Sequence, residues 1–119
     1  MTKLILVRGL PGSGKSTFAK TLDAVHYEAD QWMLNMSGEY HFNPEHLKAA
    51  HSLCLAAAKE SLADGWDVVV SNTFSQRWEM QPYYDLGYPV TELMMLGNFK
   101  NVHGVPDDKI AAMRARWEF

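Results

Sequence analysis

The chain has 119 residues, of which 47% are hydrophobic and 21% charged, and it carries a net charge of -3. This composition is typical of a soluble globular protein, and the length suits a single domain over residues 1–119, which we expect to be cytoplasmic. The acidic balance argues against an extended nucleic-acid surface. No apolar run approaches the roughly 20 residues of a membrane helix, and the single cysteine excludes an internal disulfide.

The first predicted element is a strand over residues 3–7, a short apolar run that contains β-branched residues. It leads into the stretch Gly9-Leu10-Pro11-Gly12-Ser13-Gly14-Lys15-Ser16-Thr17, which fits the phosphate-binding pattern G-x-x-x-x-G-K-[ST]. A helix is expected over residues 16–22, with Phe18, Ala19 and Leu22 on one face. The order strand, glycine loop, helix is the context that this pattern needs in order to bind phosphate.

The residue types of this loop suit phosphate chemistry. Glycines let the backbone approach a phosphate closely, so that successive N–H groups point into one concavity at a helix N-terminus. Lys15 supplies a positive charge for the β- and γ-phosphates, and Ser16 supplies a hydroxyl for Mg²⁺. The alternative is an ordinary glycine-rich turn with a solvated lysine. The predicted nucleotide-binding residues are Gly9, Pro11, Gly12, Ser13, Gly14, Lys15, Ser16 and Thr17.

Three more strands are predicted, over residues 25–29, 67–71 and 90–96. Helices are predicted from Asn43-Pro44 to Gly65, over a short segment from residue 75 that Pro82 and Gly87 limit, and from residue 106 onward. For residues 32–36 the pattern does not distinguish a short helix from a loop. The alternation predicts an α/β fold with a short, mostly parallel sheet of about four strands flanked by helices. With the phosphate-binding pattern between the first strand and the first helix, the expected class is a P-loop NTPase. Ligands bind such sheets at the carboxyl ends of the strands.

Several motifs accompany the phosphate loop: Ala29-Asp30-x-Trp32, Gly38-x-Tyr40-x-Phe42-Asn43-Pro44 and Asn101-x-His103-Gly104-Val105-Pro106. Together they resemble the small P-loop kinase-like ATPases, whose best-characterised relatives are the kinase domains of polynucleotide 5′-hydroxyl kinases. The resemblance implies the cofactors ATP and Mg²⁺ and a lid over roughly residues 97–106. It also implies that Asp30 is the general base and assists the metal, that Lys100 neutralises charge on the γ-phosphate, and that Arg116 lies near the nucleotide base.

Each of these three residues also has a structural interpretation. Asp30 is well suited to cap a helical turn. Lys100 fits a solvated loop lysine, because exposed lysine is usual. Arg116 fits an ordinary surface residue.

The chain departs from the polynucleotide-kinase pattern at the acceptor site. Residues 31–33, after Asp30, hold no arginine, residues 71–74 hold no carboxylate after the third strand, and no segment is left to form a fifth strand.

Two functional hypotheses therefore stand. One is an ATP-dependent phosphotransferase that moves the γ-phosphate to a hydroxyl of a nucleotide, nucleoside or oligonucleotide 5′ end. The other is a minimal ATP-binding or ATPase protein without kinase activity, which acts through a protein partner or a homo-oligomer at the open sheet edge. A guanine-nucleotide switch is disfavoured, because the chain has no N-K-x-D motif.

Overall fold

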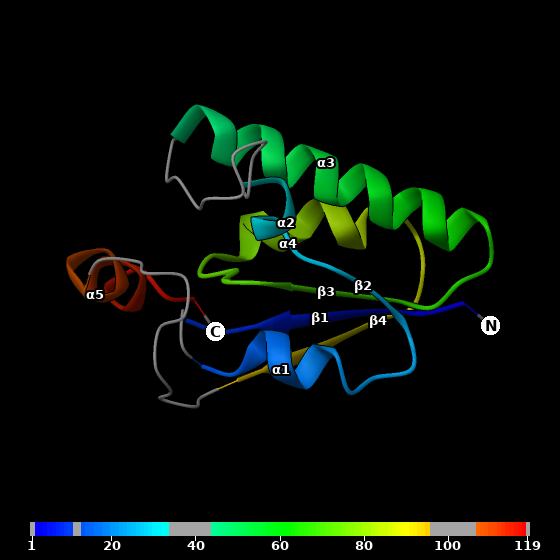
Figure 1. The fold of residues 1–119 in the computed structure, drawn as a ribbon, viewed down its shortest axis with the longest axis horizontal. Coiled ribbons are helices and arrows are strands. Elements are labelled where there is room, and N and C mark those ends of the chain that lie inside the picture. The colour runs from blue at the N-terminus through cyan, green and yellow to red at the C-terminus, as the bar shows by residue number, and fades with distance from the viewer. Residues whose placement is uncertain (1, 11–12, 34–43, 96–106, 119) are drawn as a thin grey trace.

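The computed structural model describes residues 2–10, 13–33, 44–95 and 107–118, and within them strands alternate with helices (Figure 1). The elements are β1 (Leu4–Arg8), α1 (Lys15–Ala19), β2 (Val25–Tyr27), α2 (Asp30–Met33), α3 (Pro44–Ala63), β3 (Val68–Asn72), α4 (Arg77–Tyr84), β4 (Val90–Met94) and α5 (Asp107–Ala115). The predicted α/β class is confirmed, and each predicted strand is present within a few residues of its expected position.

The four described strands form one parallel sheet in the order β2-β3-β1-β4. Strand β1 is central: Leu4 lies opposite Val68 of β3 on one side and Val90 of β4 on the other. All five residues of β3 are buried, as expected for a β-branched strand with neighbours on both sides. Because the strands are parallel, their carboxyl ends meet at one edge, which carries the phosphate loop, Asp30 and the end of β3.

Helices cover both faces of the sheet. Figure 1 shows α2, α3 and α4 on one face and α1 on the other, while α5 lies beyond the carboxyl ends of the strands. The larger core cluster joins α3 to the sheet through Ala50, Cys54, Ala58 and Leu62, the helical spacing predicted from the sequence. A smaller cluster packs Ala19 of α1, with Phe18 and Leu22, against the opposite face. No helix in the described ranges is long and apolar enough to cross a bilayer.

Helix α1 is shorter than predicted, whereas helix α4 is short, as predicted, although it runs past Pro82. Helix α1 ends at Ala19 rather than residue 22, because the N–H groups of Thr21 and Leu22 bond to carbonyls three residues back and tighten the last turn. Helix α4 continues through Pro82 to Tyr84. The proline removes one helical hydrogen bond, but both it and Trp78, four residues earlier, are exposed, so water can solvate the freed carbonyl. Asn43, the predicted cap of α3, lies outside the described residues.

Candidate functional site

The phosphate loop leaves β1 at Gly9 and enters α1 at Lys15. Gly14 has φ +87° at the N-cap of α1, a left-handed backbone conformation that favours glycine. The Gly9 N–H donates to the Thr73 carbonyl, so the loop begins tied to the segment after β3. Among the described residues, the buried Ser13 Oγ has no hydrogen-bond partner, which leaves a polar group for a ligand to satisfy. Pro11 and Gly12 lie outside the described residues.

Lys15 is the charged centre of the loop and is only 7% exposed. Burial lowers the pKa of its ammonium, and the nearby Asp30 and Glu28 carboxylates act in the opposite direction. A solvated loop lysine, the alternative left open by the sequence, does not describe this residue. A buried cation beside the glycine loop fits the charge of a triphosphate, whose oxygens would replace the lost hydration.

Glu28, the first residue after β2, connects three elements beneath the loop. Its Oε2 accepts a hydrogen bond from Ser16 Oγ of α1 at 2.6 Å and another from Ser71 Oγ of β3 at 2.9 Å. His26 Nε2 lies 2.6 Å from Ser71 Oγ and 3.6 Å from the same Glu28 oxygen. Glu28 is not among the site residues predicted from the sequence. The predicted strand over residues 25–29 contained Glu28, whereas the observed strand ends at Tyr27. An acidic residue close to the carboxyl end of a predicted parallel strand was the available signal, because that is where the strand ends converge.

Asp30 is the first residue of α2 and is partly exposed. Its charge acts on the buried Lys15 ammonium, so the structure brings together these two predicted catalytic residues. Asn72 fixes the segment that leads to Asp30, because its Oδ1 accepts a hydrogen bond from the Ala29 N–H at 2.8 Å. Asn72 is itself buried, so this hydrogen bond to the Ala29 N–H is a structural contact between the carboxyl end of β3 and the segment before α2.

Arg116 lies beyond α5, with its Nε 3.3 Å from Ser75 Oγ in the segment between β3 and α4. The neighbouring Glu118 also reaches this segment, since its N–H donates to the Ser75 carbonyl and its Oε1 accepts from the Arg77 N–H. The chain's C-terminal segment is thereby held at the carboxyl edge of the sheet. Lys100 and the predicted lid over residues 97–106 lie outside the described residues.

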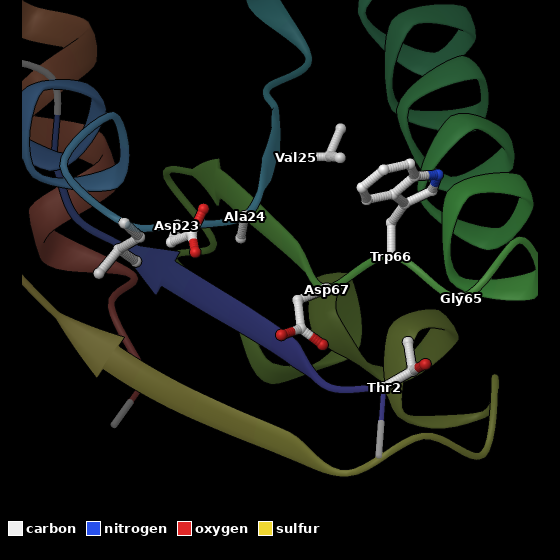
Figure 2. A pocket seen from close by; sticks show the side chains of 8 residues that line it. Thr2, Asp23, Ala24, Val25, Gly65, Trp66 and Asp67 are labelled. Carbon is white, nitrogen blue, oxygen red and sulfur yellow. The ribbon is translucent and has the colours of Figure 1, made fainter.

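A pocket of about 590 Å³ lies at the opposite, amino-terminal edge of the strands (Figure 2). The pocket is lined by Thr2, by the start of β2 and by the turn after α3. The Trp66 side chain in that turn is 62% exposed. The carboxylates of the pocket are Asp23 and Asp67, and Asp67 already accepts a hydrogen bond from the Lys3 N–H. None of the predicted site residues lines this pocket, so it is not the candidate phosphate site.

Three features define a P-loop domain of the kinase-like type: a parallel sheet with the first strand at its centre, a glycine loop that leads into α1, and a buried lysine in that loop. The model of the AAA domain family AAA_33 matches residues 4–91, and the chain belongs to this family.

The chain is 34% identical to human NEDD4-binding protein 2 over 134 residues, an alignment that covers 97% of this chain and 8% of that protein. It resembles a chain of the Pnkp1/Rnl/Hen1 RNA repair complex with a TM-score of 0.66 and 22% identity, over 94% of this chain and 36% of that one. It resembles a gluconokinase from Sinorhizobium meliloti 1021 with a TM-score of 0.62 and 20% identity, over 98% and 75% of the two chains. At these identities the structural likenesses establish the fold.

Proposed function

We propose that this domain is an ATP-dependent, Mg²⁺-requiring phosphotransferase. The observation that carries the proposal is the placement of a buried lysine beside two carboxylates, Glu28 and Asp30, at the carboxyl edge of the sheet. Phosphoryl transfer needs little covalent chemistry from a protein beyond positioning and charge stabilisation. The reaction therefore needs three groups from this site: a cation for the phosphates (Lys15), a hydroxyl for the metal (Ser16) and a carboxylate for the nucleophile (Asp30).

In this mechanism the N–H groups of the loop and Lys15 hold the β- and γ-phosphates of ATP, and Ser16 offers its hydroxyl to the metal. The acceptor oxygen forms a bond to the γ-phosphorus while the bond from that phosphorus to the β–γ bridging oxygen breaks. The hydroxyl proton passes to Asp30, and ADP leaves. Mg²⁺, when bound, supplies positive charge to the β- and γ-phosphate oxygens. Lys100 and Arg116 are the proposed contacts to the transferring phosphate and the nucleotide base.

The proposed acceptor is a hydroxyl of a nucleotide, nucleoside or oligonucleotide 5′ end. The motif resemblance supports it, as does the structural likeness to a chain of an RNA repair complex. The second candidate is an ATP-binding or ATPase protein that acts through a partner without kinase activity. Two observations favour it: residues 31–33 of α2 carry no basic side chain, and in the described sheet β4 and β2 are edge strands that another chain could pair with.

Transfer of label from γ-labelled ATP tests the two functions directly. Wild-type protein would be incubated with Mg²⁺ and a panel of 5′-hydroxyl oligonucleotides, nucleosides and nucleoside monophosphates, with Lys15→Ala as the inactive control. We expect one acceptor class to be labelled by the wild type alone. ATP binding without label on any acceptor would reject the phosphotransferase and favour the partner-dependent protein.

Gly9→Ala should weaken ATP binding through a local clash. A Cβ at this position would lie 2.3 Å from Ser13 Oγ and 3.1 Å from the Met95 carbonyl oxygen, so the loop has to shift. Overpacking of this kind costs ~1–3 kcal/mol. Because the strain falls on the loop conformation that binds phosphate, we expect ATP affinity measured by calorimetry to fall about 5–150-fold.

Gly87→Ala is the matched control, because Gly87 has φ +87° but open space around it. An alanine at a positive φ is strained, so Gly87→Ala should lower the stability of the fold, but it should leave ATP affinity unchanged. Full affinity in Gly9→Ala would contradict the steric argument.

A further inference from the structure

We propose that the two carboxylates after β2 have separate tasks: Glu28 positions the Ser16 hydroxyl for the metal ion, and Asp30 takes the proton of the acceptor. The inference deepens the proposed function and rests on it for the identity of the reaction. It assigns a positioning role to Glu28, a residue that no motif in the chain singles out.

The direction of the hydrogen bond at Ser16 carries the argument. A hydroxyl binds a cation through the lone pairs of its oxygen, so its hydrogen has to be donated elsewhere. Ser16 Oγ donates to Glu28 Oε2 at 2.6 Å, a short distance typical of a charge-assisted bond. The lone pairs of Ser16 Oγ are therefore turned away from Glu28 and are available to the ion. The negative charge of the acceptor also makes the hydroxyl oxygen a better ligand.

Two further side chains hold Glu28 in place. Ser71 has one hydroxyl hydrogen, which it donates to Glu28 Oε2. The contact between His26 Nε2 and Ser71 Oγ, at 2.6 Å, must then have the imidazole N–H as its donor. The chain of donors runs from His26 to Ser71 to Glu28, with Ser16 as the second donor. Residues of β2, β3 and α1 thus fix one carboxylate oxygen before any ligand arrives, which is the preorganisation that a metal site requires.

The position of Glu28 also accounts for a departure noted in the sequence. Residues 71–74, after the predicted third strand, include no carboxylate to support the loop hydroxyl. In the register of the sheet Tyr27 lies opposite Val70, so the next residue, Glu28, comes beside Ser71. The negative charge is thereby supplied from β2 to the place where β3 offers only a neutral hydroxyl. Asp30, two residues further on and in α2, remains for the acceptor.

The test is the gain in nucleotide affinity that Mg²⁺ produces. Calorimetry would measure the Kd of a non-hydrolysable ATP analogue with Mg²⁺ and with EDTA for wild type, Glu28→Gln and Asp30→Asn. Glu28→Gln should lower the Mg²⁺-dependent gain by about 10–100-fold, the usual cost of losing an outer-shell partner, with little change in EDTA. Asp30→Asn should retain the wild-type gain, because Asp30 takes only the proton in this proposal, without the metal-assisting role that the motif resemblance implied. A purely structural role for Glu28 would weaken binding equally in both conditions.

Ser71→Ala is a second variant that keeps the carboxylate and removes one of its two donors. It should lower the Mg²⁺-dependent gain less than Glu28→Gln does, and it decides the question if Glu28→Gln fails to fold. The inference is overturned if Asp30→Asn rather than Glu28→Gln lowers the gain, if Ser71→Ala leaves it unchanged, or if wild type shows no gain. A normal gain without phosphate transfer would reject the proposed phosphotransferase and retain the role of Glu28.

Discussion

Phosphate transfer by Asp30→Asn should be about 10²–10⁴-fold slower than by wild type, the range over which a positioned general base accelerates a reaction. Asparagine keeps the size and hydrogen-bonding capacity of the side chain but cannot accept the acceptor proton. The Mg²⁺-dependent binding of ATP should survive, because Lys15, Ser16 and Glu28 are unchanged. Single-turnover label transfer to the acceptor class that the label-transfer panel finds is the measurement, since it isolates the chemical step from product release.

Asp64→Asn is the matched control for this prediction. Asp64 is an exposed carboxylate in the turn after α3, distant in sequence from the loop, and the change in net charge is the same. Wild-type transfer by Asp64→Asn together with a large loss in Asp30→Asn would locate the effect at the carboxyl edge of the sheet. Transfer at the wild-type rate by Asp30→Asn would remove Asp30 from the mechanism and direct attention to Glu28 as the base.

The features that follow from local pattern could be predicted from the sequence. Strand β3 begins with three consecutive valines, and the burial of that run on both faces of the sheet follows from its β-branched composition. Helix α3 follows from Pro44 at its first position, from the spacing of Ala50, Cys54, Ala58 and Leu62, and from Gly65, whose φ of +92° is the expected helix-ending conformation. Parallel pairing follows from the alternation of strands and helices.

The side-chain contacts of the site could not be predicted in the same way, because they depend on sheet register and on long-range packing. Glu28 meets Ser16 and Ser71 only because β2 pairs with β3 in one register, and a shift of one residue would turn its side chain to the other face. Arg8 is the clearest case. An arginine at the end of an apolar strand suggests a solvated strand end, yet this side chain is 1% exposed.

Arg8 joins three segments that are far apart in the sequence. Its Nη2 and Nε donate to the Phe74 carbonyl at 2.7 and 3.1 Å, and Nη2 also donates to the Glu118 carbonyl. Its guanidinium lies 4.6 Å from the ring centre of Trp117, which makes a cation–π contact. Phe74 is buried with φ +47°, a conformation that a residue with a side chain keeps only when its surroundings hold it. Arg8 supplies part of that restraint.

Replacing Arg8 by methionine should therefore lower the free energy of unfolding by about 3 kcal/mol, because the buried Phe74 carbonyl and the partly buried Glu118 carbonyl lose a charged donor and Glu92 loses a partner. Urea unfolding followed by circular dichroism measures this, with the midpoint falling and the slope m unchanged. Arg77→Met is the matched control, because Arg77 also pairs with Glu92, at 2.6 Å, but is 46% exposed. Solvent screens that pair, so its loss should cost at most about 1 kcal/mol. Equal losses in the two variants would mean that the shared contact with Glu92, and not the bonds from Arg8 to the Phe74 and Glu118 carbonyls, accounts for the stabilisation by Arg8.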